Sequence, residues 1–531
     1  MANKMNTMVK VDTSLAEEAR ILDESPLNRS NIRFSRLSMK IAKQILSSAS
    51  DQPSLLEHLE LEFATLAKDW NSAAGAGGSR SKPPFCCVEG VAYAINAHKI
   101  KSIRGEGHVM ITVPFYCEFE RGRPATDENP NGEESPIQKL EECIFLLSFN
   151  DNISMDLIFV NDVIAEKKDD KDGGGSAKLF KKSILDYVAS NGLDVDLKSE
   201  RGVDGGRAEG DFDSLTALDG RLRIRFTSCE KEASKDSKFE TAEDKRRRME
   251  NRGEDGKLRE RKGGAVLTGM ELNLPENADP RRVVRCLVDG DSAHPVASYV
   301  GDAAYSILEC NHTAYLGNLK HAGTCVSVVG EESGGATAGT QAKVQNRKLF
   351  FSGFIVPFLF PELALKYQYT GTTQLPLKAF RGDIDFGKAK LKTVQPNVDL
   401  GLLALLCSSL NANGGSIDSG PVTIRDNVAS STMTTDDLCS EWTKTYGPIF
   451  TSPVSLCREL KPTEFERLPL WLTKFIENME LRHYTTLFGE EASGDSDVIA
   501  LFSIMEKYKG ATDRDAVLNQ LKTAFDKIFD A

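Results

Sequence analysis

The chain of 531 residues is longer than one ordinary hydrophobic core supports, because single domains usually hold about 100–200 residues. Its composition, 40% hydrophobic and 27% charged, is that of a globular protein and excludes a disordered or collagen-like chain. The net charge of −12 opposes a general affinity for nucleic-acid phosphates, which bind mainly to Lys and Arg. We therefore expect two or three packed units, in which any basic site is local.

The chain shows no segment typical of a membrane or secreted protein. Its longest apolar runs, such as Leu349–Phe360, are shorter than the roughly 18–20 residues that span a bilayer. Residues Met1–Asp12 lack the apolar stretch of a secretory signal. The 11 cysteines lack the dense, even spacing of a disulfide framework, which suits a reducing compartment. We expect an intracellular protein, cytoplasmic or nuclear, that is not secreted and has no membrane partner.

Residues 1–75 are predicted to form a helical N-terminal region. Apolar side chains recur at helical spacing in Ser14–Asp23, Phe34–Ser47 and Ser54–Trp70. The run Ala73–Pro84 is rich in Gly, Ser, Ala and Pro, so it ends this region.

Residues 85–228 are predicted to be the first part of a β-rich central region. The clearest strands are Val109–Phe119 and Ile153–Val160, where β-branched and aromatic residues alternate or run together. The turn residues Asn150–Asn152 predict a hairpin that joins Ile153–Val160 to a strand at Cys143–Phe149.

Two further elements are expected before residue 229. Lys178–Ser190 has the pattern of an amphipathic helix. Arg221–Thr227 alternates arginine with apolar residues, which is typical of an edge strand or a half-exposed strand.

The second half of the chain is predicted to continue the β-rich region and to end in helices. Residues 229–264 are predicted to be a flexible charged insertion, because they hold too few apolar side chains to offset the ordering entropy. Residues 265–398 are predicted to be the second part of the β-rich region, beginning with a strand at Ala265–Leu274, and residues 399–531 a helical C-terminal region. The predicted fold class is therefore α+β, with helical termini enclosing a β-rich centre.

One cluster of Cys and His has the residue types that bind zinc. Four ligands fall within sixteen residues: Cys310, His312, His321 and Cys325. Thiolate and imidazole suit this borderline-soft cation, and residues two apart in a strand point to one face, so Cys310 and His312 are expected to converge. The spacing matches neither paired Cys-x2-Cys knuckles nor a zinc finger, and buried cysteines often serve only as small apolar residues. The sequence predicts no cofactor other than this candidate zinc.

A basic loop is the second candidate site. It holds nine cations against four acids, namely Lys245, Arg246, Arg247, Arg248, Arg252, Lys257, Arg259, Arg261 and Lys262. Such a loop can bind a phosphate backbone or an acidic partner, or it can act as a nuclear localisation signal. It can equally be a solvated charge run, because the preceding residues are acidic. No aromatic residue is interleaved with the cations, which argues against base stacking.

Familiar catalytic motifs are incomplete. The loop Gly334–Gly339 has the glycine spacing of a Walker loop, but Thr340 stands where the phosphate-binding lysine is required. Asp385–Gly387 spells a kinase triplet without the rest of the kinase signature. The pairs Asp194/Asp196 and Asp211/Asp213 fall in polar loops, where acids are ordinary.

The missing enzyme signature favours a structural or assembly protein that forms homo-oligomers, of the kind found in a viral-type capsid or nucleocapsid. In this interpretation, apolar surfaces of Leu468–Leu487 and Val498–Phe529 mediate self-association. Two alternatives stay open: a nucleic-acid-binding protein that uses loop 245–262, and a metal-dependent enzyme of unknown reaction.

Overall fold

The structure is a computed structural model. It describes residues 12–25, 31–52, 54–61, 63, 84–115, 119–129, 132–161, 175–198, 214–228, 262–290, 294–318, 378–386 and 415–423. The chain divides into two compact units, and every described residue belongs to the first, which comprises Met1–Ser327, Pro376–Gly387 and Ser409–Asn427. The α+β class predicted from the sequence is confirmed in this unit, which combines helices with one mixed sheet.

A nine-stranded sheet is the centre of this unit, with the strand order β3-β4-β5-β2-β1-β6-β8-β7-β9. The strands are β1 (Gly107–Phe115), β2 (Ile153–Asn161), β3 (Val195–Lys198), β4 (Ser214–Ala217), β5 (Leu222–Ser228), β6 (Val283–Leu287), β7 (Ala314–Asn318), β8 (Lys378–Arg381) and β9 (Ile417–Pro421). Strands β5, β2, β1 and β6 are parallel neighbours. Strand β8 runs antiparallel to both β6 and β7, and β3 and β4 continue the other end of the sheet in antiparallel fashion.

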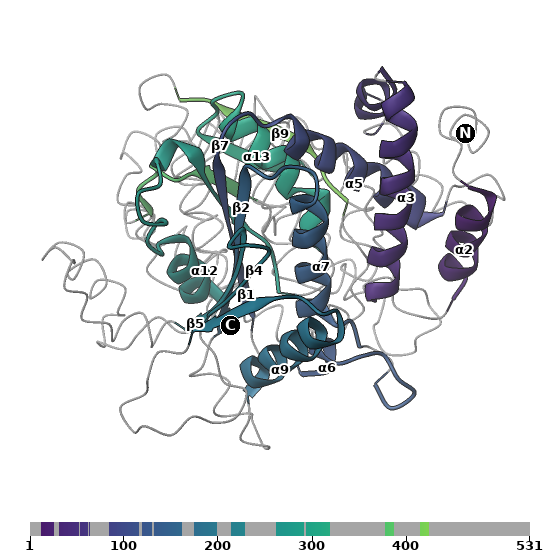
Figure 1. The fold of residues 1–531 in the computed structure, drawn as a ribbon, viewed down its shortest axis with the longest axis horizontal. Coiled ribbons are helices and arrows are strands. Elements are labelled where there is room, and N and C mark those ends of the chain that lie inside the picture. The colour runs from purple at the N-terminus through teal and green to yellow at the C-terminus, as the bar shows by residue number, and fades with distance from the viewer. Residues whose placement is uncertain are drawn as a thin grey trace, which may run out of the picture. The chain divides into compact units, whose positions relative to one another are not determined.

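Helices cover both faces of the sheet (Figure 1). They are α2 (Thr13–Asp23), α3 (Ile32–Asp51), α5 (Phe85–Ser102), α6 (Phe119–Gly122), α7 (Ser135–Leu147), α9 (Gly175–Ser190), α12 (Lys262–Met270) and α13 (Val300–Leu308), with short 3-10 turns η1 (Pro280–Arg282) and η2 (Val296–Ser298). Helices α5, α7, α9 and α13 share one large core with the sheet. On the opposite face, α12 packs on Met110 and Ile158.

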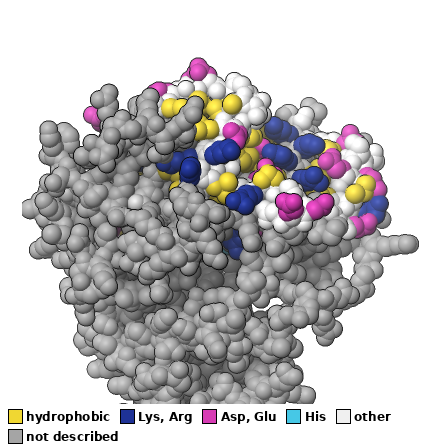
Figure 2. Space-filling model, turned by 90° about the horizontal axis from the view of Figure 1, so that it is seen from below, with side chains coloured by type: hydrophobic (Ala, Val, Ile, Leu, Met, Phe, Trp, Pro, Cys, Tyr) yellow, Lys and Arg dark blue, Asp and Glu magenta, His cyan; other side chains and the backbone are white. Residues whose placement is uncertain are grey.

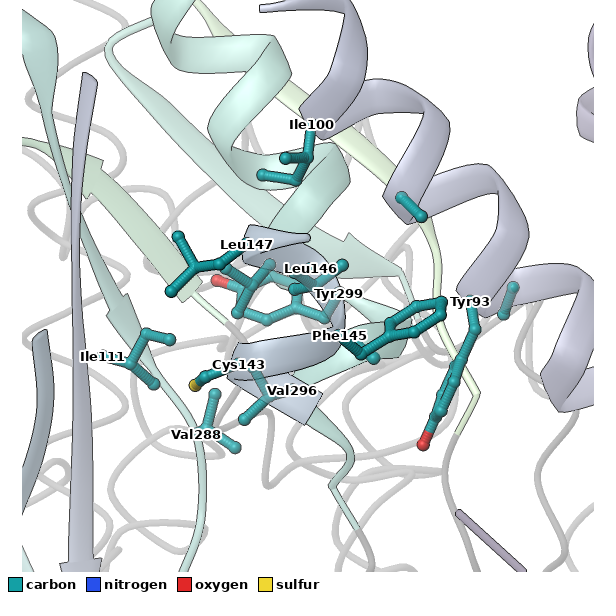
Figure 3. Packing of buried hydrophobic residues seen from close by; sticks show 14 of the residues in the cluster. Tyr93, Ile100, Ile111, Cys143, Phe145, Leu146, Leu147, Val288, Val296 and Tyr299 are labelled. Atoms are coloured by element: carbon teal, nitrogen blue, oxygen red, sulfur yellow. The ribbon is translucent and has the colours of Figure 1, made fainter. Parts of the chain in front are cut away.

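The larger core lies between the helical layer and the central strands. Tyr93 and Ile100 reach it from α5, Phe145 and Leu146 from α7, and Ile111 from β1 (Figure 3). Burying one such side chain contributes roughly 1.5–3 kcal/mol. The position of α7 is therefore set by apolar packing on both its neighbouring helix and the sheet.

Two segments that were predicted to be strands are helices. The segment Phe85–Ser102 is buried around most of its circumference, so it lacks the polar stripe by which an amphipathic helix is recognised. The predicted strand Ala265–Leu274 begins instead with α12, and the buried Arg285 donates hydrogen bonds to the carbonyls of Met270 and Leu272 just where this helix ends.

The predicted hairpin is also wrong. Cys143 lies within α7, and Asn150–Asn152 connects that helix to β2, which pairs with β1 in parallel. The turn chemistry was recognised correctly, since the Asn150 side chain accepts a hydrogen bond from the Asn152 amide (3.0 Å). Local turn chemistry does not say whether a helix or a strand comes before it.

Other predicted elements are confirmed. The structure has α2 and α3 near the predicted N-terminal helices, β1 and β2 at the predicted strands, and α9 at the predicted amphipathic helix. Strand β5 has the predicted half-exposed face of arginines, but it lies between β4 and β2 rather than at an edge.

Several predictions fall outside the described residues. These are the insertion 229–261, the strands expected between 326 and 369, and the C-terminal helices and their apolar surfaces. Strand β9 lies in a Ser- and Gly-rich stretch that reads as a connection, and β3, β4, β6, β7 and β8 were not predicted as individual strands. Among the described helices, none has the length and apolar character needed to cross a membrane.

Candidate functional site

The strand order creates a point at which the direction of the chain across the sheet reverses. From β1 the chain proceeds to β2 and then β5 on one side, and it later returns to place β6 on the other side of β1. In open α/β sheets, ligands bind outside the carboxyl ends of the strands at such a switch point, because the loops that leave it diverge. We therefore expect a ligand-binding site at the carboxyl ends of β1 and β6.

Asp289 and Gly290 lie at this place. Strand β6 is followed by Val288, whose amide still donates to the Thr112 carbonyl of β1 (3.0 Å), and then by the partly exposed Asp289. Gly290 lies so close to β1 that a Cβ there would be 2.5 Å from the Pro114 carbonyl oxygen. Only glycine permits this approach, which holds the Asp289 backbone beside the end of β1.

A second carboxylate follows in the sequence, because Asp291 comes directly after Gly290. Its placement lies outside the described residues. Two carboxylates with one residue between them, at the end of a buried strand, are hard oxygen ligands of the kind that Mg²⁺ and Mn²⁺ prefer.

A basic surface lies on the helices that follow β1 and β2. We define it by Arg121, Arg123, Lys178, Lys181 and Lys182 of α6, the residues after it, and α9. The two helices are in direct contact, since a Cβ at Gly122 would be 2.6 Å from the Phe180 ring. Figure 2 views the molecule from the side where α6 and α9 lie, and Lys and Arg side chains appear there together with Asp and Glu side chains.

A buried ion cluster links three strands at the opposite, amino end of the sheet. Asp156 of β2 is almost fully buried and pairs with Arg223 of β5, whose Nε donates to its Oδ1 (3.0 Å). The His108 Nε2 lies 3.5 Å from the same carboxylate, and His108 Nδ1 forms a hydrogen bond with Ser154 Oγ (2.7 Å). Burial opposes ionisation of Asp156, but the interactions with His108 and Arg223 outweigh it and hold its pKa below the usual value.

This ion cluster has the residue types of a catalytic site but the position of a structural one. His108, Ser154 and Arg223 are each the second residue of their strand, so the cluster lies at the amino edge, where α/β sheets rarely bind ligands. Its chemistry is that of a clamp between adjacent parallel strands.

Asp302, in the first turn of α13, is another titratable group with a shifted pKa. Tyr315 of β7 donates a hydrogen bond of 2.5 Å to Asp302 Oδ2. Burial raises the pKa of Asp302 to about 6, although the Tyr315 hydroxyl and the Lys99 ammonium oppose this and Asp418 and Glu60 add to it.

Asp302 predicts a pH-dependent stability. Its pKa is about 6 in the folded chain and about 3.9 when unfolded, so its favourable contribution is complete below pH 4 and is lost as the pH rises through 6. The free energy of unfolding of the unaltered protein should fall by about 1–3 kcal/mol between pH 4 and pH 7, and Asp302→Asn should abolish this fall. Urea unfolding of both proteins at several pH values measures the difference, and parallel pH profiles would contradict the assignment.

The structure places only half of the predicted zinc cluster. Cys310 is exposed and His312 follows it in the loop between α13 and β7, not in the expected strand. His312 Nδ1 forms a hydrogen bond with Ser416 Oγ (2.8 Å), and partial desolvation, together with the negative charge of Asp418, raises the pKa of the Cys310 thiol, which opposes the thiolate that zinc requires. His321 and Cys325 lie outside the described residues.

Within the part of the chain that the structure describes, no three or more His, Cys, Asp or Glu side chains are grouped to hold a metal. The predicted basic loop also lies outside this part, because residues 245–261 are not described and only the backbone of Lys262, at the start of α12, is. Both sites therefore stay predictions.

The sequence interpretation missed Asp289. Its signal is a nearly continuous apolar run, Val283–Val288, followed at once by Asp-Gly-Asp. Such runs are typical of strands that are buried on both faces in a parallel sheet. Other Asp-x-Asp pairs in the chain follow no such run, so the continuous apolar run before the pair is the distinguishing feature.

No protein-family model matches this chain, and no curated protein matches it either. The function must therefore be argued from the site itself.

Proposed function

We propose that this chain is a metal-dependent transferase that takes its donor group from a nucleoside diphosphate, and that a nucleoside-diphosphate sugar is the donor class. The observation that carries the proposal is the position of Asp289 at the carboxyl end of β6, beside β1, where the sheet reverses direction. Nucleotides bind at this position in doubly wound sheets.

A divalent cation explains why carboxylates occur at a site for an anion. Mg²⁺ is usually held by one or two carboxylates together with substrate phosphates, not by a cage made of protein alone. Asp289 and Asp291 are expected to bind the cation, and the diphosphate completes its coordination. The Lys and Arg side chains that define the basic surface on α6 and α9 are expected to attract an anionic substrate.

The sequence lacks the motifs that two other uses of a nucleotide require. Hydride transfer with a dinucleotide needs a glycine-rich turn directly after β1, but this chain continues there with Tyr116–Glu118. Phosphoryl transfer in a P-loop protein needs a lysine on the transferred phosphate, and Thr340 stands in its place. In glycosyl transfer the diphosphate is the leaving group, so a cation that neutralises it is sufficient.

The proposal is tested by titrating the full chain with UDP, GDP, ADP and CDP, with and without MnCl2, by isothermal titration calorimetry. We expect one of these nucleotides to bind with a Kd in the micromolar range, and at least about tenfold more weakly when Mn²⁺ is removed. Hydrolysis of the matching sugar nucleotide, measured by release of the diphosphate, then identifies the donor. Failure of all four nucleotides to bind in the presence of Mn²⁺ would overturn the proposal.

The roles predicted from the sequence keep their standing as alternatives. Self-association rests on residues 468–529 and nucleic-acid binding on residues 245–262, which the structure does not describe beyond the backbone of Lys262. The proposed transferase gives the metal-dependent enzyme a specific reaction, but it moves the expected metal from the Cys/His cluster to Asp289.

A further inference from the structure

We infer that two buried charged residues of α7, Lys139 and Glu142, are positioning residues for the carboxyl-edge site. They hold the segment His294–Ala297, which follows the proposed metal-binding residues. The inference rests on the proposed function, and it adds residues of α7 to those that shape the site.

Lys139 forms the first contact. Its side chain is fully buried, and its Nζ donates a hydrogen bond to the backbone carbonyl of His294 (3.1 Å). An ammonium group is costly to bury, and this hydrogen bond to the loop carbonyl offsets part of that cost.

Glu142 forms the second contact, one turn further along the same helix. It is also fully buried, and its Oε2 accepts a hydrogen bond from the Ala297 amide (3.2 Å). Its Oε1 accepts three more: from Ser35 Oγ of α3 (2.6 Å), Tyr93 Oη of α5 (2.8 Å) and Gln138 Nε2 of α7 (2.9 Å). The carboxylate is thus fixed by three helices and offers its remaining oxygen to the segment.

Apolar contacts also join this part of the chain to α7. Val288 and Val296 both face Cys143 of α7 in the core (Figure 3). Gly290 lies against the end of β1, and His294 and Ala297, a few residues further along the chain, are hydrogen-bonded to α7. A cation site built on a strand end needs such support, because ligands misplaced by about 1 Å lose much of their affinity.

A purely structural role would be to join α3, α5 and α7. A matched control separates the two roles, because Glu89 of α5 is equally buried and accepts a hydrogen bond from Ser38 Oγ of α3 (2.7 Å). Replacing Glu89 disturbs a buried carboxylate between helices without touching the contacts to His294 and Ala297.

The experiment compares Glu142→Gln, Lys139→Met and Glu89→Gln in the full chain, each shown to be folded by circular dichroism at the temperature used. The first measurement is the affinity for Mn²⁺ with the nucleoside diphosphate that the unaltered protein binds best. We expect a 10- to 100-fold weaker affinity for Glu142→Gln and Lys139→Met, and a change within about twofold for Glu89→Gln. The second measurement, amide hydrogen exchange without ligand, should show faster exchange at 294–297 in the first two variants only.

The outcomes separate this inference from the proposed function. If the unaltered protein binds nucleotide and Glu142→Gln and Lys139→Met bind it equally well, the inference is wrong and the proposed function stands. If exchange at 294–297 is unchanged in both variants, the inference is wrong whatever the ligand. If the unaltered protein binds no nucleotide, the proposed function is wrong, and the inference that rests on it is overturned with it.

Discussion

Asp289→Asn is expected to weaken Mn²⁺-dependent nucleotide binding about 100-fold or more, because an amide replaces the charged oxygen at the end of β6 that binds the cation. The fold should be retained, because the side chain is partly exposed and asparagine has the same shape. Calorimetric titration with the nucleotide and MnCl2 measures the loss. Asp291→Asn is expected to act similarly, since both carboxylates are proposed to bind one cation.

The matched control is Asp219→Asn. Asp219 is exposed in the turn between β4 and β5, at the amino edge of the sheet, so the same change of charge there should leave nucleotide affinity within about twofold. Equal effects of Asp219→Asn and Asp289→Asn would show that only the net charge of the protein matters. Binding by Asp289→Asn as tight as that of the unaltered protein would place the nucleotide elsewhere.

Asp156→Ala is expected to destabilise the protein by about 1–3 kcal/mol, because it removes a buried carboxylate that accepts a charge-assisted hydrogen bond from the partly exposed Arg223. Arg223 and His108 both face Asp156, and Arg225 Nη1 lies 3.7 Å from its Oδ2. Urea unfolding at pH 7 measures the loss. Because the folded pKa of Asp156 is below its unfolded value, this stabilisation is present above pH 4 and is lost as the pH falls through the folded pKa.

A double variant tests whether the ion cluster is structural. Replacing the pair together, by Asp156→Leu and Arg223→Met, removes the carboxylate and one of its cations, so we expect it to recover much of the stability that Asp156→Ala loses. Nucleotide binding should be unaffected in every folded variant, because the cluster lies at the amino edge. A specific loss of nucleotide binding in the folded double variant would move the functional site to this end of the sheet.

The prediction of helices and strands succeeded or failed for an identifiable reason. It succeeded where one face of the helix or strand is exposed to solvent, as in α3, α9 and the alternating strand β5. It failed for α5 and α12, since both are covered by neighbours and show no polar stripe. A short apolar run is compatible with a buried helix or a buried strand, and the neighbours that decide between them are distant in the sequence.

The candidate site failed to emerge from the sequence for a related reason. Cys310 and His312 attract attention because their residue types are rare and adjacent, yet one is exposed and the other bonds to Ser416. Asp289 is an ordinary acid in a chain rich in acids. Its importance comes from the strand that precedes it and from β1 beside it, and the pairing of β1 with β6 is not visible in any local pattern.

The amino-acid sequence by itself determined the α+β class, the amphipathic helices and the strands β1, β2 and β5, because these depend on hydrophobic period and composition over short windows. The tertiary structure alone decided that β1 lies between β2 and β6, that Gly290 brings Asp289 beside Pro114, and that α7 holds the segment that follows. Strand order and close backbone approach are properties of pairs of segments remote in the chain. Packing selects those pairs, so the proposed site exists only in the folded protein.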